Sequence, residues 1–140
     1  AADRFVKQYT QSGNWQAEDM QTLKDEFDRM ALAANELRLA ESNLALTREI
    51  DPWITAFGLW AQMGQEVLAL TEAATENDPK AFDYALKRIG LLKQLLEKNN
   101  QETRPASIGT AVIQPFVRTV SENAVKRFNQ QNQTTYSLNL

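Results

Sequence analysis

The sequence predicts an all-α protein, folded as an antiparallel bundle of about four main helices. Helix-forming residues dominate it, and only five glycines and four prolines interrupt them. Apolar residues recur three and four positions apart over long segments, whereas strand-like alternation flanked by turn pairs is missing. A chain of 140 residues is long enough for one domain with its own core. We therefore expect a single helical domain over residues 1–128 and a polar, loosely ordered tail over residues 129–140.

Two helices are expected in the first third of the chain. The segment Asp3–Thr10 predicts a short helix that the Ser-Gly-Asn turn at residues 12–14 ends. A longer helix should run from about Gln16 to Glu41, because apolar residues recur there as one stripe. We expect this stripe to face the core; its members are Met20, Leu23, Phe27, Met30, Ala34 and Leu37.

A third helix is expected to begin at Asp51 and Pro52 and to end near Glu76. Aspartate is a favoured N-cap, and proline is tolerated at the first helical position because the N–H there has no partner within the helix. Residues 43–48 either continue the second helix or form a short connector.

The same start signal recurs in the Asn-Asp-Pro turn at residues 77–79. Asp78 should cap a fourth helix that Pro79 opens and that ends near Lys98. The apolar set of this helix is Phe82, Leu86, Ile89, Leu92 and Leu96, flanked by Leu91 and Leu95.

A polar loop over Asn99–Pro105 should lead to the last helix, which starts near Ser107 or Ile108 and ends at Phe128. Pro115 has no N–H to bond back to residue 111, so it either kinks this helix or marks its true first turn. One side of the helix is apolar and comprises Ile113, Phe116, Val117, Val120, Ala124 and Phe128.

Composition excludes several classes of function. The net charge is −3, so no basic field is present that would hold nucleic acid. The chain contains neither cysteine nor histidine, which removes thiol nucleophiles, thiolate zinc sites and the commonest general base and metal ligand. We assign no cofactor and no metal ligand. The longest apolar runs are too short to cross a bilayer.

The acidic residues are the remaining candidates for catalysis. Glu18-Asp19 and the Asp25-Glu26-x-Asp28 group lie on the polar side of a helix pattern, where we expect solvent exposure. Hydrolysis by carboxylates would need two that converge, one of them in an apolar pocket. We assign no catalytic residue, and an enzyme that uses carboxylates alone stays as an alternative. Ion pairs at helical spacing are expected for Lys24–Asp28, Asp25–Arg29 and Asp83–Lys87.

The segment from Glu49 to Leu70 carries an aromatic face. Trp53, Phe57, Trp60, Gly64 and Val67 follow alternating spacings of four and three, which favours a buried central helix. The alternative is an exposed platform for a sugar ring or a partner helix. Gly64 lowers helix propensity by about 1 kcal/mol relative to alanine, so we expect another helix to approach closely there. Trp15, just before the second helix, is either a hydrophobic staple or a partner contact.

Two segments resemble a known family. "EIDPWITAFGLWAQMGQEVLAL", residues 49–70, resembles the Pro-Trp-x-x-x-Phe…Gly pattern of the helical domain that follows the catalytic barrel in bacterial family 84 glycoside hydrolases. These enzymes are β-N-acetylglucosaminidases known as O-GlcNAcases, also called hyaluronidases. "GTAVIQPFVRTVSENA", residues 109–124, is similar to the closing helix of that domain, with its Val-x-x-Pro-Phe core. The resemblance covers residues 16–128.

The resemblance implies a fold like that of the hyaluronidase post-catalytic domain. The matching positions are packing or domain-interface positions: Pro52, Trp53, Phe57, Trp60, Gly64, Pro115 and Phe116. No catalytic residue carries over, because the family's adjacent aspartates lie in the barrel and this chain has no Asp-Asp pair.

The chain starts at alanine rather than methionine, and we interpret it as a fragment. By the resemblance, it is a non-catalytic domain that buttresses the catalytic barrel or helps to shape substrate access. Its implied partners are the catalytic domain of the same polypeptide and, through the parent enzyme, a glycan or glycoprotein. The implied location is secreted or periplasmic. The alternative is a free-standing helical interaction module with an apolar groove, which should expose part of the Trp53/Trp60 face.

Overall fold

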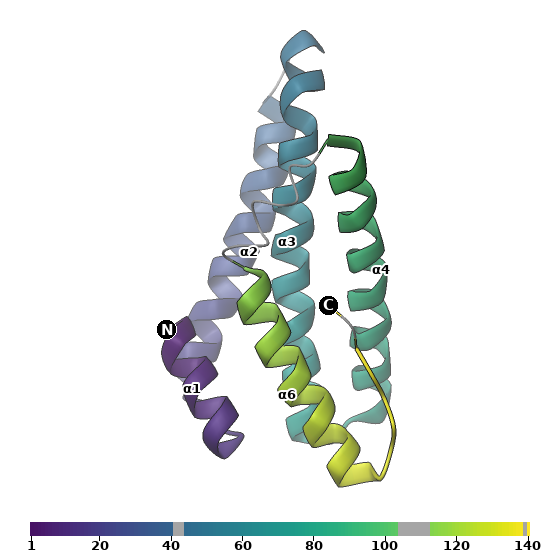
Figure 1. Ribbon diagram of the computed structural model, residues 1–140. Coiled ribbons are helices and arrows are strands. Elements are labelled where there is room, and N and C mark those ends of the chain that lie inside the picture. The colour runs from purple at the N-terminus through teal and green to yellow at the C-terminus, as the bar shows by residue number, and fades with distance from the viewer. Residues whose placement is uncertain (41–43, 104–112, 139) are drawn as a thin grey trace.

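The computed structural model describes residues 1–40, 44–103, 113–138 and 140. Its helices are α1 (Ala2–Ser12), α2 (Ala17–Ala40), α3 (Leu44–Glu76), α4 (Pro79–Thr103) and α6 (Gln114–Asn132). Within these ranges the chain is helical with no strand, so the all-α prediction is confirmed. Figure 1 shows α2, α3 and α4 side by side, with α6 lying across only the lower part of α3 and α1 beside α2 and α6. The central helix is α3, which packs against α2, α4 and α6.

The first helix ends where the sequence predicted. Gly13 adopts a left-handed conformation (φ 74°), and its N–H donates to the carbonyl of Tyr9 at 2.9 Å. A side chain at this position would be strained, and its Cβ would also overlap the guanidinium of Arg127 from α6. Glycine is therefore required here both for backbone conformation and for space.

The start of α3 differs from the prediction. The helix begins at Leu44, and Pro52 lies inside it. Asp51 does not act as an N-cap there; its Oδ1 accepts a hydrogen bond from Nε of Arg38 at 3.1 Å. Proline at position 52 removes one hydrogen bond of the helix ladder, but the contact with α2 holds this segment in place. Glu76 ends the helix as predicted. Of the preceding segment, residues 41–43 lie outside the described ranges.

The fourth helix begins as predicted and ends later. Its N-cap is confirmed, because the N–H of Ala81 donates to Oδ1 of Asp78 at 3.2 Å. The helix continues to Thr103, so the loop predicted to start at Asn99 is wrong for residues 99–103. Asn99 instead faces α3, where its Nδ2 donates to the carbonyl of Pro52 at 3.4 Å. The remaining loop residues, 104 and 105, lie outside the described ranges.

In α6, Pro115 occupies the first turn, which confirms one of the two alternatives for this residue. The start predicted near residues 107–108 lies outside the described ranges. The helix extends past Phe128 to Asn132. Its predicted apolar side is confirmed: Val117, Val120, Ala124 and Phe128 are buried, and Ile113 and Phe116 pack partly buried against the core.

Part of the tail is ordered against the core. Tyr136 lies against the stacked rings of Phe82 and Phe128, whose centroids are 3.9 Å apart. Asn129 holds it there, because its Oδ1 accepts from the Tyr136 N–H (3.0 Å) and its Nδ2 donates to the Tyr136 carbonyl (2.8 Å). The expectation of a loose tail is wrong for this segment. The composition of the tail alone does not reveal that α4 and α6 provide a surface on which Tyr136 packs. The extent of the domain along the chain stays a prediction.

Candidate docking surface

The aromatic line on α3 is buried at one end and exposed at the other. Trp53, Trp60 and Val67 follow one another at intervals of seven, which places them on one side of the helix. Val67 and Trp60 are buried, with Trp60 only 8% exposed, whereas Trp53 is 51% exposed. Phe57, one turn from Trp53, is 40% exposed. The prediction of a buried helix is confirmed for Trp60 and wrong for Trp53 and Phe57.

A second line on α2 shows the same change. Leu23, Met30 and Leu37 are also seven residues apart; Leu23 is buried, Met30 is half-buried and Leu37 is 54% exposed. The predicted core stripe of α2 is thus confirmed for Met20, Leu23, Phe27 and Ala34, and wrong for Leu37. Because α2 and α3 run antiparallel, both lines become exposed at the same end of the bundle.

The extent of α6 explains where the two lines become exposed. Near its first turn, Phe116 contacts the ring of Phe27 on α2 at 5.9 Å between centroids. Phe27 in turn lies on Gly64 of α3, where an added Cβ would overlap its ring. The close crossing of helices predicted at Gly64 is therefore confirmed. Beyond this point α6 no longer covers α2 and α3 (Figure 1). We call the exposed group Leu37, Trp53 and Phe57 the upper apolar patch.

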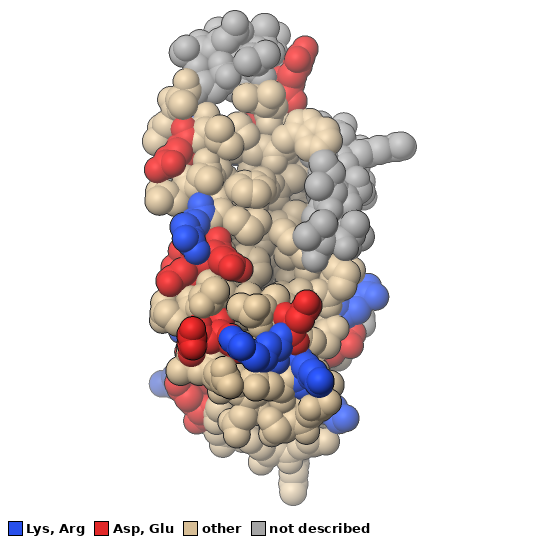
Figure 2. Space-filling view, turned by 90° about the vertical axis from the view of Figure 1, so that its left-hand side faces the viewer, with Lys and Arg blue, Asp and Glu red and all other residues tan. Residues whose placement is uncertain are grey.

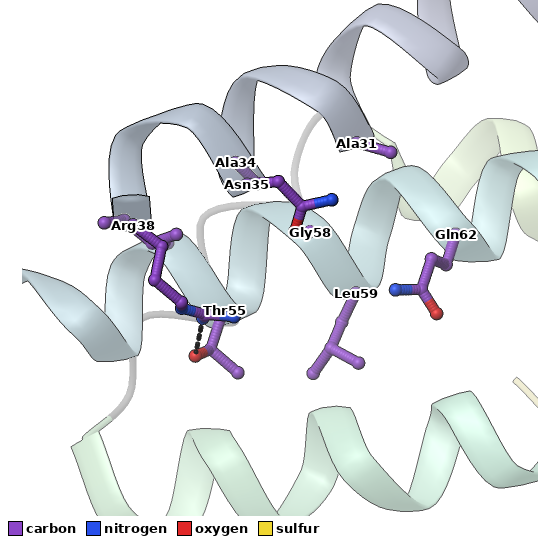
Figure 3. A pocket seen from close by; sticks show the side chains of 9 residues that line it. Ala31, Ala34, Asn35, Arg38, Thr55, Gly58, Leu59 and Gln62 are labelled. Atoms are coloured by element: carbon purple, nitrogen blue, oxygen red, sulfur yellow. Dashed lines mark hydrogen bonds between the residues drawn. The ribbon is translucent and has the colours of Figure 1, made fainter. Parts of the chain in front are cut away.

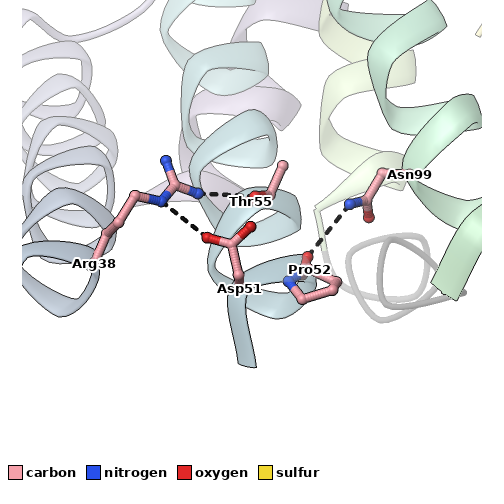
Figure 4. A network of polar contacts seen from close by, with 5 residues as sticks. All are labelled: Arg38, Asp51, Pro52, Thr55 and Asn99. Carbon is pink, nitrogen blue, oxygen red and sulfur yellow. Dashed lines mark hydrogen bonds and ion pairs between the residues drawn. The ribbon is translucent and has the colours of Figure 1, made fainter. Parts of the chain in front are cut away.

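Polar contacts join α2, α3 and α4 in the same upper part of the bundle (Figure 4). Arg38 of α2 donates to Asp51 of α3 at 3.1 Å and to Oγ1 of Thr55 at 2.8 Å, and Asn99 of α4 donates to the carbonyl of Pro52. Exposed ion pairs of this kind contribute only about 0.2–1 kcal/mol. Their role is geometric: they set the register of α2 against α3, so that Leu37 lies level with Trp53.

A cleft of about 160 Å³ lies between α2 and α3, on another side of α3 than Trp53 and Phe57 (Figure 3). Small residues, Ala31, Ala34 and Gly58, form part of its wall, and the amide side chains of Asn35 and Gln62 line it. None of its lining residues is acidic, and none belongs to the upper apolar patch. The cleft therefore does not provide the convergent carboxylates that hydrolysis would need.

Asp19 is buried, which contradicts the prediction of a solvated acidic face at this residue. Arg4 of α1 donates from Nε to Oδ2 of Asp19 at 2.6 Å and makes a second contact with Oδ1. The hydrogen bond from Arg4 is the main cause that holds the pKa of Asp19 below its ordinary value. Glu18, Asp25, Glu26 and Asp28 are exposed, as predicted. Asp19 is thus a structural carboxylate that joins α1 to α2.

The expected ion pairs are formed only in part. Lys87 and Asp83 pair within α4 at 2.8 Å, as predicted. Lys24 does not pair with its helix neighbour; it reaches Glu72 of α3 at 2.6 Å, while Asp28 accepts from Gln65 at 2.8 Å. Asp25 accepts from Gln21 on its own helix. The contacts across α2 and α3 depend on tertiary packing, so helical spacing alone did not reveal them.

The remaining predicted positions surround the first turn of α6. Pro115 is exposed, Phe116 is half-buried between Phe5 and Phe27, and Pro52 is half-buried on α3. Trp15 packs within the chain, against Phe5 at 5.6 Å and Tyr9 at 5.7 Å between ring centroids. Among the described residues, no three acidic side chains gather as a metal ion would require. Nor does any helix in those ranges have the length and apolarity of a membrane span.

Residues 1–121 match a protein family whose description is bacterial GH84, post-catalytic domain. The match contains all seven positions that carried the resemblance, from Pro52 to Phe116. It also includes α1, which lay outside the resemblance of residues 16–128. Because the matched region is most of the 140-residue chain, this chain belongs to the family of bacterial GH84 post-catalytic domains.

Proposed function

We propose that this accessory domain of a GH84 enzyme buttresses the catalytic domain of the same polypeptide and takes no part in bond cleavage. The observation that carries the proposal is the way in which α1 is fixed to the bundle. A post-catalytic domain follows its catalytic domain, so the chain enters the bundle through α1. The bundle can stabilise a preceding domain only if α1 keeps a fixed orientation relative to the other helices.

Three sets of contacts hold α1. Its Arg4 binds the buried Asp19 of α2, and its Phe5 packs against Trp15 and Phe116. Thr10 accepts a hydrogen bond from Asn123 of α6 at 3.1 Å.

The C-terminal turn of α1 adds an aromatic contact. Burial raises the pKa of Tyr9 to about 12, so its ring stays neutral, and the guanidinium of Arg127 lies 5.4 Å from the ring centroid. The helix is thus joined to both α2 and α6 along its length. These contacts support a rigid connection between the two domains.

The parent enzyme, on this proposal, hydrolyses N-acetylglucosaminides of glycans or glycoproteins in a secreted or periplasmic location. The acid pair that the family uses would lie in the barrel. The described carboxylates of this chain are either solvated or paired with cations, and so support a structural role.

The test compares the parent enzyme with a version that ends before residue 1 of this chain. We expect the truncated enzyme to lose activity faster at elevated temperature, because a domain that braces the barrel raises the barrier to its unfolding. Turnover of an aryl N-acetylglucosaminide should be found in the parent enzyme and not in this chain alone. Equal half-lives of the two enzymes, or turnover by the isolated chain, would refute the proposal.

Two other roles predict different results. If the domain shapes substrate access, truncation changes KM for a glycoprotein substrate more than for a small aryl glycoside. A free-standing interaction module is favoured by one observation, the half-exposed Trp53. Such a module would bind a separate protein, and truncation would leave the heat resistance of the catalytic domain unchanged.

A further inference from the structure

We infer that the upper apolar patch, Leu37, Trp53 and Phe57, is the surface on which the catalytic domain of the same polypeptide packs. The inference rests on the proposed function and adds to it the place of contact. It follows from the size of the patch and from the point at which the chain enters the bundle, and it is compatible with the distribution of charge.

The size of the patch is comparable to that of the largest apolar patch on a typical monomeric protein. If a full large side chain presents about 200 Å², the exposed fractions of these three side chains amount to roughly 300 Å². Apolar patches of this size on a single domain are often binding sites. A stable interface covers about 800 Å² on each partner, so the patch would form its apolar centre, where tryptophan is enriched.

The position at which the chain enters the bundle indicates which partner covers the upper apolar patch. The catalytic domain precedes α1, and Phe5 lies one turn from the start of that helix. Phe5 contacts Phe116 at 6.3 Å between ring centroids, and Phe116 marks the place where α6 stops covering α2 and α3. Figure 1 shows the N-terminal end close to the level of the first turn of α6. The catalytic domain is therefore joined to the bundle near the level of the first turn of α6, below the patch and on the side of the bundle where α6 leaves α2 and α3 uncovered (Figure 1).

The distribution of charge is compatible with this contact. On the face that α1 and α2 present, Figure 2 shows most of the charged side chains at and below mid-height, acidic side chains also at the upper left edge and at the top, and an uncharged strip between them. At the level of the patch, Arg38, which lines the cleft between α2 and α3, forms an ion pair with Asp51. Leu37, Trp53 and Phe57 carry no charge themselves, so a partner that packs on them does not have to remove water from charged groups of the patch, which is the usual obstacle to burying a surface.

Hydroxyl-radical footprinting of the parent enzyme tests this directly. Trp53 and Tyr84 are both more than half exposed in this domain, at 51% and 63%, and their rings have similar intrinsic reactivity. We expect Trp53 to be oxidised several-fold more slowly than Tyr84 in the parent enzyme. Equal rates would show that the patch is uncovered and would overturn the inference. Protection of Trp53 that grows with enzyme concentration would also overturn it, since a second copy would then be the occupant.

A pair of matched double variants separates this inference from the proposed function. W53S/F57S removes the centre of the patch, where the side chains are 51% and 40% exposed. L91S/L95S removes two leucines of α4 that are somewhat more exposed, at 59% and 50%, and that lie elsewhere. Circular dichroism should show unchanged helicity for both, because none of these side chains is buried. We expect only W53S/F57S to shorten the half-life of activity in the parent enzyme, toward the value of the truncated enzyme.

The outcomes are distinguishable. If truncation shortens the half-life and W53S/F57S behaves like L91S/L95S, the domain is a buttress but the patch is not its contact surface. If truncation itself has no effect, the proposed function fails, and the inference fails with it.

Discussion

The part of α2 and α3 that α6 covers and the part beyond it have the same apolar sequence pattern, but the first is buried and the second is exposed. On α2 and α3, apolar residues recur every seven positions along the whole of both helices. Where α6 covers them, Leu23 and Val67 lie in the core; past Phe116, Leu37 and Trp53 are half exposed. Periodicity therefore identifies which side of a helix is apolar, but not which helix or domain covers it.

The largest expected effect is the difference in stability between variants of Trp60 and Trp53, the two tryptophans of the aromatic line on α3. Trp60→Ala should lower the free energy of unfolding by about 3–5 kcal/mol, because it empties a buried indole site. Trp53→Ala should change it by less than ~1 kcal/mol in the domain alone, since half of that side chain is in water. Urea unfolding of both variants measures the difference. Similar losses would mean that the two parts do not differ in packing.

Gly64 tests the tight crossing between α2 and α3. Gly64→Ala should destabilise the domain by about 1–3 kcal/mol, because the new Cβ overlaps the ring of Phe27 and forces it to move. The matched control is Gly90→Ala in α4, where nothing lies within 4 Å of the added Cβ. That change should instead stabilise the helix by ~0.5–1 kcal/mol. Unfolding midpoints that shift in the same direction for both variants would contradict the crossing.

A smaller effect on stability is expected from Tyr136, where the C-terminal tail packs against α4 and α6. Tyr136→Ala removes contacts with the rings of Phe82 and Phe128, and aromatic pairs of this type contribute about 0.5–1.5 kcal/mol beyond buried area. Tyr84→Ala on the exposed side of α4 is the control and should have less effect. Thermal unfolding followed by circular dichroism compares the two. A Tyr136 variant as stable as the control would indicate that the tail is not part of the folded unit.

The last test concerns the pH dependence of the contact between α1 and α2. The hydrogen bond from Arg4 lowers the pKa of Asp19 in the folded state, so the unfolded state binds a proton more readily. This contribution to stability is therefore present above the ordinary aspartate pKa of about 3.9 and is lost as pH falls through the lowered value. In Asp19→Asn, the fall in unfolding free energy below about pH 4 should be shallower than in the unchanged chain. Identical slopes would show that Asp19 is not paired in solution.

Short-range signals were sufficient to predict much of this fold. Gly13 ends α1, Asp78 and Pro79 begin α4, and Pro115 marks the first turn of α6, because caps and prolines act through backbone groups within one turn. The Pro-Trp-x-x-x-Phe pattern at residues 52–57 was likewise enough to suggest the family.

Contacts between distant segments decided the rest. Asp51 is a residue type that favours the N-cap position. In the structure its carboxylate instead accepts a hydrogen bond from Arg38 of α2, and α3 begins earlier, at Leu44. Asp19 lies in a polar run and is buried with Arg4 bound to it. Trp53 is half exposed in the part of α3 that α6 does not reach (Figure 1). A residue's own neighbours in the chain set its helix and its side of that helix. Its burial depends on what another segment brings to that side, which is why only the tertiary packing could separate the core from the upper apolar patch.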